Sequence, residues 1–309
     1  MNKTIISALV YIFLLPVDLV PLQISYRLAS FIGSLAYHFM PAKRVITIAN
    51  MMRVTGGNTE QAHQLAQKSF RSYGMYVVDL LRLLRQARKR EVRDVSSRVK
   101  ILDANIVHGL RRGNGVIAIG LHAGMWDFGP AAATQLLGIP TSVVADEFKN
   151  QNFDFLVKKI RHSLGFDLIP AKGHALQIHR QLKQNNLVSI LIDVPPVVEE
   201  AVEVTFFGER VLIHDGPARL SLLSGAPIIA GFPMRTGPYS DKALLLIEPV
   251  TFEPTGNMDT DVAFLTQSMM NAIEKLIRND LSQWHMYRYF WSKDRFHIGG
   301  GIRIRVRSD

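Results

Sequence analysis

The 309-residue chain contains no cysteine. Disulfide bonds, thiolate-bound zinc and a cysteine nucleophile are therefore excluded, and a reducing compartment is permitted. The sequence also lacks the G-x-S-x-G turn of α/β serine hydrolases and the G-x-x-x-x-G-K-[ST] loop of phosphate-binding enzymes. Zinc-finger spacing and an aromatic-basic ribonucleoprotein signature are missing as well. These absences argue against serine hydrolases, P-loop enzymes and nucleic-acid-binding proteins.

Charged residues are sparse, at 20% of the chain, whereas 48% of the residues are hydrophobic. This balance excludes wholesale disorder, and no Pro/Gly/Ser-rich linker divides the chain. The charge is uneven in sign, with a net charge of +10 and a pI of about 9.9. A basic surface favours anionic partners, such as a phospholipid bilayer or an acidic carrier. Motifs for nucleic-acid binding are missing, and the N-terminus is apolar. Both observations favour membrane lipids as the anionic partner.

Residues 1–41 are predicted to form membrane-contact helices, and residues 42–309 to form the main domain. The stretch 4–17 carries no charge, but Asp18 follows it and two prolines break helix continuity. A spanning helix needs about 20 mostly apolar residues. We therefore expect one or two short helices in the membrane interface, and leave open whether the segment spans the bilayer. The structural alternative is an apolar helical hairpin packed on the protein's own core.

Residues 43–90 have a helical pattern, and from about residue 98 short apolar runs alternate with helical stretches. The predicted buried strands are 116–119, 141–144, 187–192, 227–230 and 243–247. The predicted helices between and after them lie near 104–112, 127–137, 149–164, 174–185, 216–224 and 262–279. This alternation indicates an α/β fold with a mostly parallel central sheet flanked by helices. Such sheets bind their ligands at the carboxyl ends of the strands.

The apolar run 116–119 is followed by Gly-Leu-His-Ala-Gly-Met-Trp-Asp, which places His122 at a strand end and Asp127 in the next helical turn. An imidazole there can take a proton from a hydroxyl, and a carboxylate on its other ring nitrogen fixes the tautomer. The spacing alone is weak evidence, because His162 and Asp167 repeat it without the strand-end context. From the residues alone, a catalytic histidine and a hydrogen-bonded core histidine both stay open.

Leu121-His122-x4-Asp127 resembles the His-x4-Asp/Glu motif of glycerolipid acyltransferases. The wider pattern is similar to the branch that contains bacterial lipid A late acyltransferases and phosphatidylinositol mannoside acyltransferases. Four further blocks in the expected order carry this resemblance: Arg161-x3-Gly165-x2-Leu168-Ile169-Pro170, Leu191-Ile192-Asp193, Val202-Glu203-Val204-Thr205-Phe206-Phe207-Gly208 with Gly216-Pro217-Ala218-Arg219-Leu220 and Ser224-Gly225-Ala226-Pro227, and Gln283-Trp284-His285-Met286 with Trp291. Together they cover about residues 40–295.

The resemblance implies that His122 is the general base and that Asp127 is its orienting partner. Arg161 is implied to bind a phosphate or the developing oxyanion, and Asp193 to position the acceptor or the histidine. For both, an ordinary salt bridge is the alternative. Glu203 is a further substrate-binding candidate, although a glutamate alternating with valines also suits a strand that faces water.

The resemblance further implies transfer of a fatty acyl chain from a thioester, either acyl-CoA or acyl carrier protein, to a hydroxyl of a membrane glycolipid. A thioester is already activated, so neither a metal nor another cofactor is expected. Backbone N–H groups near Gly124 are additional candidates for stabilising the oxyanion.

The Trp-His-Met block and Val-x-Val-Thr-Phe-Phe-Gly favour a phosphatidylinositol mannoside-type acceptor over a lipid A precursor. The implied location is the cytoplasmic face of the plasma (inner) membrane, peripheral or N-terminally anchored. The oligomeric state is left open. A non-catalytic, basic lipid-binding protein of the membrane surface is the alternative function.

Overall fold

The computed structural model describes residues 20–87, 95–110, 113–148, 150–196 and 201–291. The charge-free stretch 4–17 lies outside these residues. The helices are α2 (Leu22–Phe39), α3 (Pro41–Val54), α4 (Thr59–Ala87), α5 (Ala104–Leu110), α6 (Phe128–Leu136), α7 (Gln151–Ser163), α8 (Ala175–Lys183), α9 (Gly216–Ser224), α10 (Met258–Ile277) and the 3-10 helix η2 (Leu281–Gln283). The strands are β1 (Val99–Ile101), β2 (Val116–Gly120), β3 (Thr141–Ala145), β4 (Asp167–Pro170), β5 (Leu187–Leu191), β6 (Ala201–Phe206), β7 (Glu209–His214), β8 (Ile228–Arg235) and β9 (Ala243–Val250).

A seven-stranded sheet with the order β1-β9-β8-β2-β5-β3-β4 forms the centre of the molecule. The strands from β8 to β4 are parallel to one another, and β9 runs antiparallel to β8. The predicted mostly parallel α/β sheet is confirmed, and all five predicted strands belong to it. The sequence pattern missed β1 and β4, because strands of three and four residues are too short to show a run.

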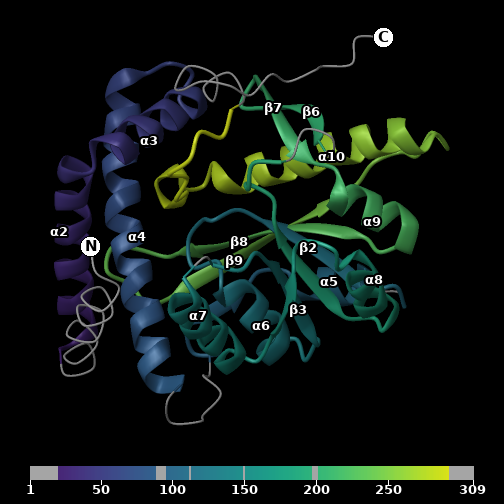
Figure 1. Ribbon diagram of the computed structural model, residues 1–309, viewed down its shortest axis with the longest axis horizontal. Coiled ribbons are helices and arrows are strands. Elements are labelled where there is room, and N and C mark those ends of the chain that lie inside the picture. Colours follow the sequence, from purple (N-terminus) through teal and green to yellow (C-terminus); the bar gives the residue numbers. More distant parts are fainter. Residues whose placement is uncertain (1–19, 88–94, 111–112, 149, 197–200, 292–309) are drawn as a thin grey trace.

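Helices cover both faces of the sheet (Figure 1). Buried side chains of α8, α9 and α10 share one core cluster with Ile117 and Ile119 of β2. On the opposite face, α5 and α6 pack near Val116, and α6 and α7 pack near Val143 of β3. Both faces of β2 are therefore buried, as its continuous apolar run predicts.

The helices α2 and α4 pack together on one side of the sheet (Figure 1). Gly33 and Gly74 allow the close contact, since a Cβ at either position would lie 2.4 Å from a carbonyl oxygen of the other helix. The outer face of α2 is apolar and exposed, at Ile24, Leu28, Phe31, Ile32, Leu35 and Phe39. In the part of the chain that the structure describes, no helix is long and apolar enough to cross a membrane.

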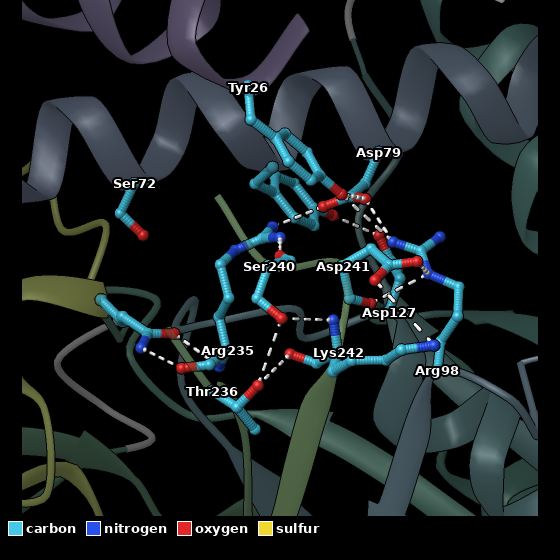
Figure 2. A network of polar contacts seen from close by, with 12 residues as sticks. Tyr26, Ser72, Asp79, Arg98, Asp127, Arg235, Thr236, Ser240, Asp241 and Lys242 are labelled. Atoms are coloured by element: carbon cyan, nitrogen blue, oxygen red, sulfur yellow. Dashed lines mark hydrogen bonds and ion pairs between the residues drawn. The ribbon is translucent and has the colours of Figure 1, made fainter. Parts of the chain in front are cut away.

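A buried ionic network joins these helices to the sheet (Figure 2). Asp79 of α4, whose side chain is completely buried, accepts hydrogen bonds from Arg98 and from Arg235 of β8, each at 2.5 Å. The Tyr26 hydroxyl of α2 donates to the same carboxylate at 2.6 Å. Burial raises the pKa of Asp79, but the two guanidinium groups outweigh it and hold that pKa below its ordinary value.

Candidate active site

His122 lies two residues after the end of β2, at the carboxyl edge of the sheet. Its Nδ1 lies 2.7 Å from Oδ1 of Asp193, and its backbone N–H donates to Oδ2 of the same carboxylate at 2.9 Å. The Asp193 side chain is fully buried, whereas 37% of the His122 side chain is exposed. The carboxylate thus holds the imidazole from the interior of the protein and leaves part of the ring accessible.

Strand pairing explains why these two residues meet. In the parallel pair of β2 and β5, Gly120 lies opposite Leu191. Two residues beyond that pair, His122 and Asp193 leave the sheet at the same edge. The carboxyl ends of adjacent parallel strands therefore place a histidine and an aspartate side by side, although 71 residues separate them in sequence.

The hydrogen bonds at Asp193 define the protonation of the pair. Trp284, which is completely buried, donates its Nε1–H to Oδ2 at 3.0 Å. Burial raises the pKa of Asp193, but the charge and hydrogen bonds of His122 and the indole of Trp284 outweigh it and hold the pKa below its ordinary value. Because an ionised carboxylate only accepts hydrogen bonds, Nδ1 of His122 is the donor and Nε2 carries the lone pair.

The same contact acts on the imidazole. Burial lowers the pKa of His122, but the charge of Asp193 and its hydrogen bond outweigh that effect and raise the pKa above its ordinary value of 6.5. The ring is therefore more basic than a free histidine, which suits a group that accepts a proton.

Asp127 contacts other side chains. Its Oδ2 accepts a hydrogen bond from the Tyr76 hydroxyl of α4, and its Oδ1 accepts one from Arg161 Nε of α7 at 2.9 Å. From the sequence we expected Asp127 to orient His122, but the carboxylate that contacts Nδ1 of His122 in the structure is that of Asp193. The physical reason is that Asp127 ends the turn before α6 and bonds to α4 and α7. Arg161, which is 11% exposed, is held in this ion pair.

The loop after His122 is fixed by backbone hydrogen bonds. The N–H of Gly124 donates to the Gln283 carbonyl, and the N–H of Met125 donates to the Pro233 carbonyl, both at 2.9 Å. Gly124 has a φ of +61°, and a Cβ there would lie 2.3 Å from the Pro233 oxygen, so only glycine fits. Since both N–H groups have carbonyl partners, the sequence expectation that they bind an oxyanion does not agree with the structure.

Glu203 lies on β6, in a separate two-stranded sheet with β7. Its carboxylate is 53% exposed and pairs with Arg210 of β7 at 3.1 Å. Among the described residues, no hydrogen bond or ion pair joins Glu203 to the other four predicted site residues. The structure thus brings together His122 and Asp193, and separately Asp127 and Arg161, but places Glu203 on a hairpin.

An apolar cavity begins beside His122. It lies between the sheet and α5 and α6, and its volume is about 60 Å³, within about 570 Å³ of empty space that includes open solvent. Gly120, Leu121 and Trp126 line it near His122, and apart from Ser189 the rest of the lining is apolar or glycine. In the described residues, no group of three or more His, Asp or Glu side chains is arranged to hold a metal ion.

Two contacts of the site were not predicted from the sequence. Trp284 was recognised only as part of a closing block that resembles the family's, and its bond to Asp193 depends on how the segment after η2 packs beside the site. Tyr76 carried no sequence signal, because it lies 51 residues before Asp127 on a long helix. Only the packing of α4 beside the site brings that hydroxyl to the carboxylate.

The comparisons with known proteins agree with the resemblance. A family model described as bacterial lipid A biosynthesis acyltransferase matches residues 1–293. A phosphatidylinositol mannoside acyltransferase of Mycobacterium tuberculosis (strain ATCC 25618 / H37Rv) is 27% identical over 246 residues, which are 78% of this chain and 73% of the relative. The protein of the same name from Mycolicibacterium smegmatis is 26% identical over 251 residues, 79% of this chain and 78% of the relative. The chain is therefore an O-acyltransferase of glycolipid biosynthesis and belongs to the bacterial lipid A biosynthesis acyltransferase family.

Proposed function

We propose that the protein transfers a fatty acyl chain from an acyl thioester to a hydroxyl of a membrane glycolipid, with His122 as the general base and Asp193 as the residue that orients it. The observation that carries this proposal is the 2.7 Å contact between Nδ1 of His122 and buried Asp193, next to Leu121 in the lining of the apolar cavity. It leaves the Nε2 lone pair for a hydroxyl proton.

The reaction requires no covalent enzyme intermediate. Nε2 of His122 takes the proton of the acceptor hydroxyl while the hydroxyl oxygen attacks the thioester carbonyl carbon. The carbonyl electron pair moves to oxygen and then returns as the C–S bond breaks. The leaving thiolate receives the proton from Nε2, which restores the neutral imidazole. Asp193 stabilises the imidazolium that exists between these two proton transfers.

The apolar cavity supports an acyl substrate. It follows β2 and β5 from Gly120 and Leu191, next to His122, to Leu187 at the other end of β5. Four residues of strand correspond to about 13 Å. An alkyl chain in this cavity is removed from water, while its thioester carbonyl stays near the imidazole.

The relatives supply the proposed acceptor class. Both are named phosphatidylinositol mannoside acyltransferases, so we favour a phosphatidylinositol mannoside-type glycolipid over a lipid A precursor. Family membership also favours an enzyme over a non-catalytic lipid-binding protein. Acyl-CoA and acyl carrier protein are both candidate donors, and comparing the rates with each identifies the one that the enzyme uses.

We further propose that the protein contacts the membrane surface through α2. Six large apolar side chains on this helix are between 39% and 78% exposed. The chain also has a net charge of +10, which favours anionic lipids. This arrangement is typical of an amphipathic helix that lies in the interface, at the cytoplasmic face where activated acyl donors are available.

Thiol release tests the reaction. Purified protein in detergent is incubated with palmitoyl-CoA or palmitoyl carrier protein, with and without a phosphatidylinositol mannoside or a lipid A precursor. We expect acceptor-dependent release that falls about 10²–10⁴-fold in His122→Ala, because general base catalysis is lost.

His162→Ala is the matched control, since His162 has the same spacing to an aspartate but lies exposed on α7. Equal rates for His122→Ala and His162→Ala would show that His122 is a core residue without a catalytic role. No thiol release with either donor, from folded protein, would contradict the proposed function as a whole.

A further inference from the structure

The tetrahedral intermediate of acyl transfer carries a negative oxygen, which needs hydrogen-bond donors. The backbone N–H groups of Gly124 and Met125 already donate to carbonyls. Phe128 and Gly129, at the start of α6, donate to the carbonyls of Met125 and Trp126. Arg161 is held by Asp127. These five donors are therefore already engaged in hydrogen bonds.

The indole of Trp126 offers a donor without a hydrogen-bond partner in the part of the chain that the structure describes. Its Nε1 atom is buried and has no hydrogen-bond partner among the described residues. A buried donor without an acceptor is energetically costly, because it has lost its hydrogen bonds to water. An acceptor supplied by a substrate would remove this cost when it binds.

The position of the indole fits the reacting carbonyl. The Trp126 ring lies edge-on to the His122 ring, with centroids 5.5 Å apart. It also lines the apolar cavity beside Gly120 and Leu121. The indole therefore lies both beside the His122 ring and in the wall of the cavity that would hold an acyl chain.

The ring is held in place from its other side. Tyr76 lies against the Trp126 indole with ring centroids 3.6 Å apart, and the Tyr76 hydroxyl donates to buried Asp127. Asp127 and Arg161 therefore act on the indole through Tyr76. This gives the aspartate of the His-x4-Asp motif a positioning role, distinct from that of Asp193.

The neighbouring histidine cannot supply a positive charge in place of the indole. His285 lies with its ring centroid 5.6 Å from that of Trp126. Burial lowers the pKa of His285 to about 3, so its ring is neutral at physiological pH. The indole N–H of Trp126 is therefore a neutral donor beside a neutral histidine ring.

We infer that the Nε1–H of Trp126 donates a hydrogen bond to the thioester carbonyl oxygen and stabilises the oxyanion formed there. This inference rests on the proposed acyl transfer. When the acceptor oxygen bonds to the carbonyl carbon, the C=O electron pair moves to oxygen, which accepts the indole hydrogen bond. The indole keeps its proton. When the C–S bond breaks, the C=O bond reforms and the thiolate leaves with the proton from His122.

Two tryptophan variants test the inference kinetically. Trp126→Phe keeps an aromatic ring against Tyr76 but removes the N–H. Trp291→Phe is the matched control, because its Nε1 is also buried without a partner among the described residues but its ring packs with Phe206 and Phe290. We expect kcat of Trp126→Phe to fall about 10²–10³-fold, as for the loss of one oxyanion donor, with a small change in KM. Similar kcat values for the two variants, at equal thermal stability, would overturn the inference.

A spectroscopic measurement reports the contact without turnover. The chain contains three tryptophans, so full-length ¹⁵N-labelled protein gives three indole N–H signals that Trp→Phe variants assign. The ligand is a palmitoyl-CoA analogue in which CH₂ replaces the thioester sulfur, which keeps the carbonyl but cannot transfer the acyl group. We expect the Trp126 signal to move downfield and the Trp291 signal to stay.

The outcomes separate the two levels of the proposal. A stationary Trp126 signal at saturating analogue contradicts the contact, even if the enzyme is active. If the wild-type protein transfers no acyl group to any acceptor, the proposed function fails, and the indole signal still decides whether Nε1–H meets the carbonyl.

Discussion

At the scale of single residues, the site contains two carboxylates with different roles, those of Asp193 and Asp127. Asp193 is buried under the imidazole, with three hydrogen bonds that fix its position. Asp127 bonds to Tyr76 and Arg161. A carboxylate that touches the base changes its basicity directly, whereas one that touches the scaffold changes the geometry of what surrounds the base.

The pH profile distinguishes these tasks. His122 works as a base only when neutral, and Asp193 raises its pKa, so wild-type kcat should fall as the pH drops through a value above 6.5. In Asp193→Asn the negative charge is gone and burial lowers the pKa. The acid limb should therefore move to lower pH, while the plateau kcat falls on the order of 10²–10⁴-fold.

Asp127→Asn is the control for this measurement. It should lower activity while leaving the acid limb near its wild-type position, because His122 keeps its hydrogen bond to Asp193. An unchanged acid limb in Asp193→Asn would mean that the limb reports another group.

At the scale of elements, α6 forms one wall of the acyl cavity. Its buried residues include three with small side chains, Ala131, Ala132 and Ala133. Ala133 lines the cavity and packs in the core cluster that includes Leu187 and Ile229. The small side chains on this face leave the space between helix and sheet that the cavity occupies.

Filling this space should change the preferred acyl chain. Ala133→Phe is expected to lower the rate with palmitoyl-CoA at least 10-fold relative to the rate with octanoyl-CoA, since a larger side chain shortens the cavity. The ratio of the two rates is the measurement, because partial unfolding lowers both rates alike. Leu136→Phe, on the exposed side of α6, should keep the wild-type ratio. The same ratio in both variants would place the acyl chain elsewhere.

At the scale of the whole molecule, the N-terminal helices and the sheet form one body. Tyr26 of α2, Asp79 of α4 and Arg235 of β8 are joined in one buried network. The backbone N–H of Arg235 then donates to the side chain of Gln283. The backbone carbonyl of Gln283 accepts a hydrogen bond from the N–H of Gly124 in the catalytic loop. The helix with the exposed apolar face is thus connected to the active site through buried hydrogen bonds.

Breaking this network should destabilise the fold. Asp79→Asn leaves the buried guanidinium of Arg235 without its counter-charge and removes one of the two carboxylates that pair with Arg98. Removing one partner of a buried ion pair typically costs about 3–5 kcal/mol. Denaturant unfolding measures this change. Asp259→Asn, whose carboxylate is 88% exposed and 3.5 Å from Arg219, should change stability by less than about 1 kcal/mol.

The wild-type contribution of Asp79 should also depend on pH. Because its folded-state pKa lies below its unfolded value of 3.8, the stabilisation is present above that value and disappears as the pH falls through the folded pKa. Equal unfolding free energies for Asp79→Asn and wild type at neutral pH would refute the importance of the network.

Membrane binding depends on the exposed face of α2. Phe31→Asp replaces a side chain that is 62% exposed, and should weaken binding to anionic vesicles at least 10-fold, because burying one aromatic side chain contributes about 1.5–3 kcal/mol. Phe264→Asp on α10, where Phe264 is 53% exposed, is the control and should bind as wild type. Co-sedimentation measures both, and equal loss in the two variants would exclude α2 as the specific contact.

The sequence by itself determined the parts of this protein that depend on near neighbours in the chain. Continuous apolar runs predicted the five longer strands of the seven-stranded sheet. The position at the end of one of these strands selected His122. The ordered motif blocks led to the family. These signals are local, because periodicity and turn residues act over a few positions.

Only the tertiary structure decided which polar groups meet. Asp193 lies beside His122 because β5 is the neighbour of β2, and no local pattern encodes strand order. Asp127 bonds to Tyr76 and Arg161 because α4 and α7 pack around the turn before α6. Within the described ranges, the Trp126 indole N–H has no hydrogen-bond partner, and this too depends on what surrounds the indole, since burial and hydrogen bonding are properties of the packed molecule.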